Sequence, residues 1–84
     1  MEESVLEDVR TKIREILQKY SEKEVGDGDI SLIEDLEFDS LQLIEALTEI
    51  EEVFRISFED GEILLDMVDH SEEMIQYVES SIRQ

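Results

Sequence analysis

The segment from Asp35 to Leu41 contains the side chain best placed for chemistry, the hydroxyl of Ser40. Acidic residues flank this serine, a loop precedes it, and a helix is expected to begin beside it. The free N–H groups and the dipole at the start of a helix stabilise a phosphate. Serine is also common at helix starts for capping alone. The segment therefore suits an ordinary helix start or a serine beside which a phosphate is held.

A second segment, Asp27-Gly28-Asp29, has the acidic and glycine residues of a calcium-binding loop. Such a loop needs Gly at its sixth position and Glu at its twelfth. Counted from Asp27, these positions hold Leu32 and Phe38. The spacing therefore fails, and we predict no dedicated metal site.

The residues that usually carry out catalysis are scarce in this chain. His70 is the only histidine and there is no cysteine, so nucleophile–base pairs are hard to assemble. Carboxylates are abundant, but nothing in the sequence marks one of them as an acid of raised pKa. We expect His70 to lie at the surface, and we predict that the chain is not an enzyme. Any thiol chemistry must come from a cofactor.

The charge balance limits the partners. The 84 residues include 25 Asp and Glu against 7 Lys and Arg, which gives a net charge of −18. Such a charge repels nucleic acid and favours basic protein partners. The acids are unevenly spread, because residues 24–82 hold 19 of them and a single base, Arg55, whereas residues 1–23 hold 6 acids and 5 bases.

The apolar content predicts a folded protein with one small domain over residues 1–84. Val, Ile, Leu and Phe make up 28 of the 84 residues, well above the roughly 20% below which highly charged chains stay disordered. No apolar run is long enough to span a membrane, and the acidic start, Met-Glu-Glu-Ser, is unlike a signal peptide. We therefore expect a soluble, monomeric protein of the cytoplasm.

Apolar residues at helical spacing predict two long helices. The first covers residues 4–20, and Ser4 and Glu7 have the spacing of a capping box. The second covers residues 40–54 with Asp39 as its N-cap. Between them, a long loop is expected to pack across the core and to contain a turn capped by Ser31 and Glu34.

The rest of the chain predicts two further helices, one short and one of ordinary length. The short helix lies around residues 63–68, and the last covers about residues 70–82, with Asp69 and Glu72 spaced as a second capping box. The methionines and the apolar stripes, which include Ile82, are predicted to form the core. The fold class is all-α, a small four-helix bundle with three main helices, one short helix and a long loop between the first and second.

Several segments together resemble the acyl carrier proteins. Asp39-Ser40-Leu41 looks like their Asp-Ser-Leu attachment motif, and the run from Asp39 to Phe54 is similar to their second helix. Further resemblance comes from the flanking segments Glu34-Asp35-Leu36, Arg55-Ile56-Ser57-Phe58-Glu59-Asp60 and Ile75-Gln76-Tyr77-Val78. The resemblance covers nearly the whole chain in length, acidity and order of elements.

This resemblance implies that Ser40 carries 4'-phosphopantetheine, with Asp39 and Leu41 beside it as part of the cofactor-binding motif. A phosphopantetheinyl transferase would move the group from coenzyme A, with magnesium, through attack of the Ser40 hydroxyl on the pyrophosphate. The thiol at the end of the arm forms thioesters. The chain would present acyl intermediates to acyl-transferring and chain-elongating enzymes of fatty-acid, polyketide or related lipid biosynthesis.

The resemblance also implies a docking surface along the second helix for basic patches on those enzymes. Its apolar members are Leu41 and Ile44. Acidic members carried over by position are Asp39, Glu45, Glu51, Glu52 and Asp60. The helical wheel adds Glu49 to the acidic face.

Three positions depart from the pattern of the family. Glu37 stands where a Gly is usual, Gln42 where an Asp is usual, and Glu59 near the position of a common Pro. These departures leave the attachment motif intact and indicate a specialised carrier. Asp39 in place of the His of peptidyl carriers favours acyl or polyketide cargo.

A different class of function stays open from the residues alone. The acidic face with Glu45, Glu49 and Glu52 also fits an unmodified helical interaction module that binds a basic protein partner.

Overall fold

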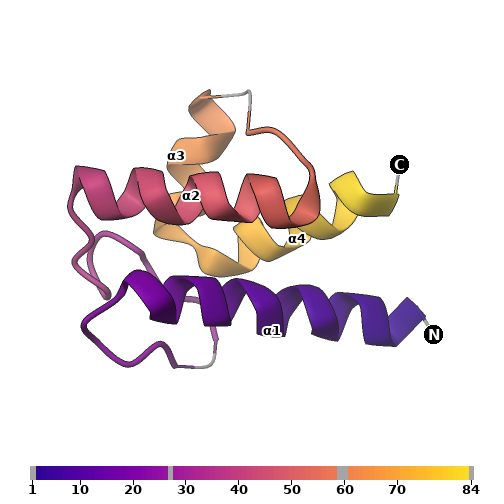
Figure 1. Cartoon of the computed structure of the whole chain (residues 1–84), viewed down its shortest axis with the longest axis horizontal. Helices are drawn as coiled ribbons and strands as arrows, with labels where there is room; N and C mark the ends of the chain where they lie inside the picture. The colour runs from indigo at the N-terminus through magenta and orange to yellow at the C-terminus, as the bar shows by residue number, and fades with distance from the viewer. Residues whose placement is uncertain (1, 27, 59–60, 84) are drawn as a thin grey trace.

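All regular secondary structure in the described part of the chain is α-helical. The computed structural model describes residues 2–26, 28–58 and 61–83, and within them there are four helices and no strand. They are α1 (Glu2–Tyr20), α2 (Ser40–Phe54), α3 (Gly61–Asp69) and α4 (Ser71–Arg83) (Figure 1). The predicted all-α bundle with one short helix and a long first loop is confirmed.

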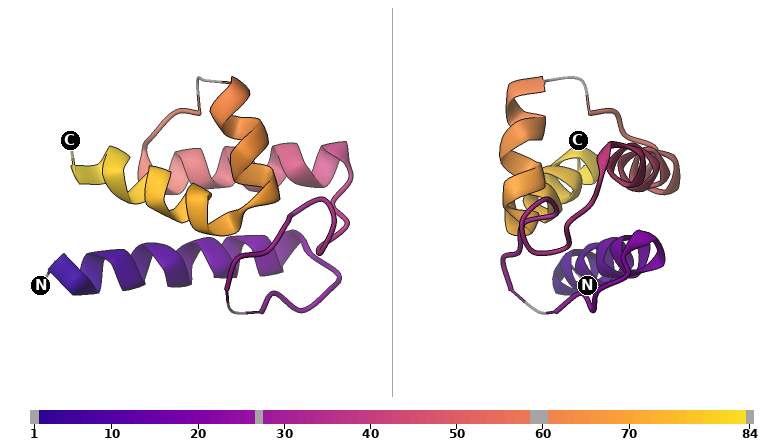
Figure 2. Two further views of the ribbon diagram at one scale, coloured as in Figure 1. Left: turned by 180° about the vertical axis from the view of Figure 1, so that it is seen from behind. Right: turned by 90° about the vertical axis from the view of Figure 1, so that its left-hand side faces the viewer.

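The longest helix, α1, contacts two of the other three helices directly. It packs against α2 and α4, and α3 packs against α4. Figure 2 shows α3 lying across the direction of α1 and α2. The spacing of Ser4 and Glu7 predicted that Ser4 is the N-cap of this helix. That prediction is wrong, because α1 begins at Glu2 and Ser4 lies inside the helix. An N-cap precedes the first helical residue, so Ser4, which follows Glu2 by two positions, cannot act as one.

One apolar core joins all four helices and the long loop. Full burial of each aliphatic side chain contributes about 1.5–3 kcal/mol. Met67 and Met74 belong to this core, as predicted, whereas Ile82 in the last turn of α4 is 40% exposed and does not. The buried apolar residues are Val9, Ile13, Ile16, Leu17, Leu32, Leu36, Phe38, Ala46, Leu47, Ile50, Met67, Val68, Met74, Ile75 and Val78.

Bases of the N-terminal segment pair with acids from the rest of the chain. The Arg10 guanidinium binds the Glu72 carboxylate of α4 through two N–H groups. The Lys19 ammonium lies 2.9 Å from the Glu49 carboxylate of α2. The uneven charge distribution of the sequence is therefore partly neutralised where α1 meets the other helices.

The long loop is anchored to the junction of α3 and α4. The Leu32 N–H donates to the Val68 carbonyl at 2.8 Å, and the Ser71 N–H donates to the Ile30 carbonyl at 2.9 Å. The Ser71 hydroxyl accepts from the Ile30 N–H at 3.0 Å. These bonds satisfy backbone groups that the loop would otherwise bury unpaired.

The predicted turn at the centre of this loop is present, but the carboxylate that bonds back to Ser31 comes from Asp35 and not from Glu34. The Ser31 hydroxyl accepts from the Glu34 N–H at 3.0 Å, and the Asp35 carboxylate accepts from the Ser31 N–H at 2.7 Å. Leu36 and Phe38, which follow the turn, are both buried. The turn therefore directs the chain into the core just before α2 begins.

The start of α4 is capped from the loop and not by the predicted pair Asp69 and Glu72. Asp69 is the last residue of α3, and its carboxylate accepts from the Ser31 hydroxyl at 3.3 Å. The Glu72 N–H donates to the Asp29 carboxylate at 3.1 Å. Only one residue separates α3 from α4, and Asp69 still belongs to α3. The carboxylate that caps α4 therefore comes from Asp29, 43 residues before Glu72.

The same Asp29 carboxylate lies 2.8 Å from the Nδ1 atom of His70. His70 is exposed, as predicted. The hydrogen bond with Asp29 raises the pKa of His70, and the neighbouring charges of Glu73 and Asp69 add to this effect. Conversely, the His70 hydrogen bond and the Glu72 N–H lower the pKa of Asp29.

These shifts predict how stability depends on pH. Because the folded-state pKa of His70 is raised, His70 stabilises the fold fully below its unfolded pKa of 6.5. This stabilisation is lost as pH rises through the folded-state pKa. Asp29 contributes above its ordinary pKa of 3.8 and loses its contribution as pH falls through the lowered one. The melting temperatures of wild type and His70→Gln should therefore differ most near about pH 5 and converge as pH rises through the folded-state pKa of His70.

The control for this measurement removes the partner. In an Asp29→Asn background, the pH-dependent difference that His70→Gln produces should be much smaller, since only the charges of Glu73 and Asp69 then raise the pKa of His70. A higher melting temperature of the wild type that persists unchanged at high pH would contradict the assignment of this stabilisation to protonated His70.

Candidate functional site

The start of α2 is closed by a capping box. Asp39 has an extended backbone, φ −84° and ψ 179°, and its carboxylate accepts from the Gln42 N–H at 2.8 Å. In return, the Gln42 side-chain oxygen accepts from the Asp39 N–H at 2.9 Å. The predicted N-cap at Asp39 is confirmed, and Gln42 is its reciprocal partner.

Ser40 is the first residue of α2 and lies exposed. The capping box occupies the Gln42 N–H, and the Leu43 N–H donates to the Asp39 carbonyl at 3.0 Å. The N–H groups of Ser40 and Leu41 have no partner among the residues that the structure describes. An exposed hydroxyl beside two unpaired N–H groups at the positive end of a helix dipole fits a phosphodiester on Ser40.

The segment before this serine is held by the buried residues Leu36 and Phe38, through their side chains and their backbone N–H groups. The Leu36 N–H donates to the Ser31 carbonyl at 3.1 Å, and the Phe38 N–H donates to the Leu32 carbonyl at 3.0 Å. Glu37 between them has a left-handed backbone, with φ +55°. This conformation favours glycine, which explains why Gly is the usual residue at this position in proteins that the sequence resembles. The Glu37 carboxylate pairs with Lys23.

The predicted docking residues fall into two groups. Leu41 and Ile44 are 65% and 61% exposed, large fractions for apolar side chains. Asp39, Glu45 and Glu52 are exposed as well. These five residues lie on the accessible surface at and beyond the start of α2, while Asp60 lies outside the described residues.

Glu49 and Glu51 are engaged within the chain. The Glu49 carboxylate accepts from the Tyr20 hydroxyl at 2.5 Å and from Lys19 at 2.9 Å, and these bonds lower its pKa. The Glu51 carboxylate accepts from the Phe58 N–H at 2.8 Å and thereby fixes the connector after α2. A helical wheel places both residues on a helix but does not show which neighbouring element each one meets.

Sequence reasoning missed the role of Gln42 and the exposure of apolar residues such as Val53 and Leu65. The Asp39–Gln42 spacing is itself a capping-box signal, so the reciprocal cap was visible in the sequence. Val53 and Leu65 are 42% and 69% exposed. No signal in the sequence distinguishes these two residues from members of the core stripes.

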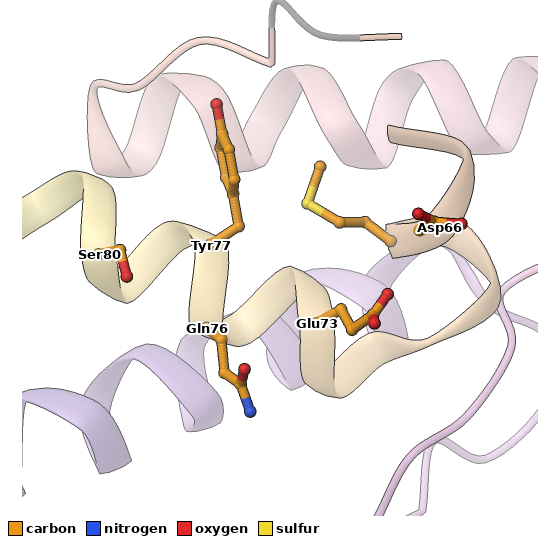
Figure 3. A pocket seen from close by; sticks show the side chains of 6 residues that line it. Asp66, Glu73, Gln76, Tyr77 and Ser80 are labelled. Atoms are coloured by element: carbon orange, nitrogen blue, oxygen red, sulfur yellow. The ribbon is translucent and has the colours of Figure 1, made fainter. Parts of the chain in front are cut away.

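An open surface pocket of about 360 Å³ lies between α3 and α4, away from the predicted site residues. Figure 3 shows the Asp66 and Glu73 carboxylates toward one end of it and the Tyr77 ring toward the other. Within residues 2–26, 28–58 and 61–83, no three acidic or histidine side chains are grouped to hold a metal ion. None of the helices described there has the length and apolar character needed to cross a membrane.

Comparison with known proteins identifies the family. Residues 7–78, most of the chain, match the family described as phosphopantetheine attachment site. The chain belongs to this family, which confirms the resemblance to acyl carrier proteins. A search among curated proteins and a search among solved structures each found no match.

Membership in this family establishes the general role. The family carries covalently attached 4'-phosphopantetheine, so the chain is a phosphopantetheine carrier and not an enzyme. Family membership also implies two kinds of interaction partner, a phosphopantetheinyl transferase and the enzymes that use the phosphopantetheine arm.

The left-handed backbone at Glu37 predicts an unusual order of stability for two variants. Glu37→Gly and Glu37→Ala both lose the Lys23 pair, but only glycine adopts φ +55° without steric cost. Glu37→Gly should therefore be more stable than Glu37→Ala by about 1 kcal/mol in chemical denaturation.

Glu15, an exposed residue within α1, supplies the control. In a helix interior the order reverses, so Glu15→Gly should be less stable than Glu15→Ala by about 1 kcal/mol. The same order at both positions would mean that Glu37 is not held in the left-handed conformation.

Proposed function

We propose that Ser40 is the attachment point for 4'-phosphopantetheine. The observation that carries this proposal is the exposed hydroxyl of Ser40 at the start of α2, next to the unpaired N–H groups of Ser40 and Leu41. A phosphopantetheinyl transferase would bring coenzyme A and magnesium to this hydroxyl. The Ser40 oxygen would then give up its proton and bond to the phosphorus that bears pantetheine, while the P–O bond to the second phosphate of the pyrophosphate breaks and adenosine 3',5'-bisphosphate leaves. Once attached, the arm supplies a terminal thiol for thioesters, which this cysteine-free chain cannot supply itself.

The cargo that we propose is an acyl intermediate of fatty-acid, polyketide or related lipid biosynthesis, carried in the cytoplasm where coenzyme A is available. Support comes from Asp39, which stands where peptidyl carriers typically have His. A tether raises the effective concentration of the cargo at whichever enzyme is docked. The carrier then needs only weak and rapidly reversible contacts with each partner.

We propose that the exposed residues at and beyond the start of α2 form the docking surface for basic patches of these enzymes. These residues are Asp39, Leu41, Ile44, Glu45 and Glu52. Exposed ion pairs contribute about 0–1 kcal/mol each and mainly accelerate encounter. Glu49 and Glu51 are expected to contribute less, because their carboxylates already accept hydrogen bonds within the chain.

The attachment proposal predicts one specific modification. Incubation with coenzyme A, magnesium and a broad-specificity phosphopantetheinyl transferase should add the mass of one 4'-phosphopantetheine, measured on the intact protein. Ser40→Ala should abolish the gain, and Ser57→Ala, which removes an exposed hydroxyl from the connector after α2, should keep it. No gain in the wild type would favour the unmodified acidic module instead.

The docking proposal predicts an effect of charge that depends on position. Reversal of two charges in Glu45→Lys/Glu52→Lys should raise the KM of the transferase for the carrier about tenfold, since two favourable contacts become repulsive. The double variant Asp8→Lys/Glu15→Lys changes the net charge equally on exposed positions of α1. If it raised KM as much, the general charge of the protein and not the α2 surface would be responsible.

A further inference from the structure

Gln42 makes three hydrogen bonds that meet at the start of α2. Its backbone N–H and its side-chain oxygen bond to Asp39, at 2.8 and 2.9 Å. Its side-chain N–H donates to the Tyr20 carbonyl at 2.9 Å. Tyr20 is the last residue of α1, so one amide side chain joins the end of the first helix to the start of the second.

The bond to Tyr20 requires the donor of an amide. The last carbonyls of a helix have no partner inside the helix and need an outside donor. A carboxylate at residue 42 could accept from the Asp39 N–H but could not donate to Tyr20. The departure of Gln42 from the Asp that is usual in the family therefore gives this chain a link between α1 and α2 that an Asp cannot make.

Tyr20 is held at a second point on the same face of α2. Glu49 follows Gln42 by seven residues, two helical turns, and accepts from the Tyr20 hydroxyl at 2.5 Å. The two contacts differ in their distance from Ser40. Gln42 acts on the first turn of α2, where Ser40 lies, whereas Glu49 acts on the middle of the helix.

We propose that Gln42 is a positioning residue for the modification of this carrier. It fixes the first turn of α2 to the end of α1, so the Ser40 hydroxyl is presented to the transferase in one orientation. This inference rests on the proposed attachment at Ser40. Misplacement of a reacting group by even about 1 Å lowers rates strongly, by up to about a hundredfold.

The principal variant is Gln42→Met, which keeps a linear side chain and the net charge but removes both side-chain bonds. Transferase kinetics with coenzyme A and magnesium should show kcat about tenfold lower. KM should change less than about twofold, because the exposed acids of α2 that mediate encounter are untouched. Gln42→Glu keeps an acceptor for Asp39 but lacks the donor for Tyr20, and it should lose kcat to a similar extent.

Tyr20→Phe is the matched control, since it removes the bond to Glu49 and leaves the Tyr20 carbonyl in place. It loosens the same pair of helices, so its melting temperature should fall, yet its kcat should equal that of the wild type. A kcat for Gln42→Met within about twofold of the wild type, or an equal loss of kcat in Tyr20→Phe, would overturn the proposal.

Amide hydrogen exchange of the unmodified protein tests the tether without any transferase. In Gln42→Met, the backbone amides at positions 42 and 43 should exchange about tenfold faster than in the wild type, while that of Ile50 stays unchanged. Unaltered exchange at residues 42 and 43 would overturn the proposed tether. If the wild type gains no mass at Ser40, the attachment proposal fails; a modified wild type with unaffected Gln42→Met kinetics overturns the role of Gln42 alone.

Discussion

Repulsion among carboxylates is the constraint around which this small protein is built. Residues 24–82 hold 19 acids and one base, and that stretch supplies three of the four helices. α1 provides the opposing charge, through Arg10 to α4 and Lys19 to α2, along with an apolar stripe for the core. Because neutralisation is concentrated where α1 meets the other helices, the outward face of α2 keeps exposed carboxylates such as Glu45 and Glu52. The fold therefore remains stable without neutralising the surface that partners are proposed to recognise.

The start of α2 combines a firm backbone with an accessible hydroxyl. Asp39 and Gln42 close the first turn between them, and the buried side chains of Leu36 and Phe38 fix the approach from the loop. Ser40 takes no part in these contacts, which leaves its side chain at the surface. Both properties suit the proposed attachment at Ser40, which requires a hydroxyl that an enzyme can reach and a helix that keeps its shape during successive encounters.

Much of this architecture is predictable from local pattern, and the remainder depends on contacts between distant residues. The span of α2, the cap at Asp39 and the turn at Ser31 follow from residues within a few positions of one another. The cap of α4 by Asp29 and the capture of Glu49 by Tyr20 join residues 43 and 29 positions apart, so no local signal reveals them. The exposure of Ile82 has a related cause, because helical periodicity does not show where the opposing wall of the core ends.

The attachment of the long loop to the α3–α4 junction has a consequence for the protein during its synthesis. The partners of Ile30 and Leu32 are Ser71 and Val68, which the ribosome adds almost forty residues later. Until those residues emerge, the loop has none of these bonds, and closing so wide a gap has an entropic cost that the finished helices must offset. Ser40 is therefore translated early, whereas the bonds that tie the preceding loop to the α3–α4 junction form only after residues 68–71 have emerged. A growing chain thus displays the serine before the contacts that hold the preceding loop in place have formed.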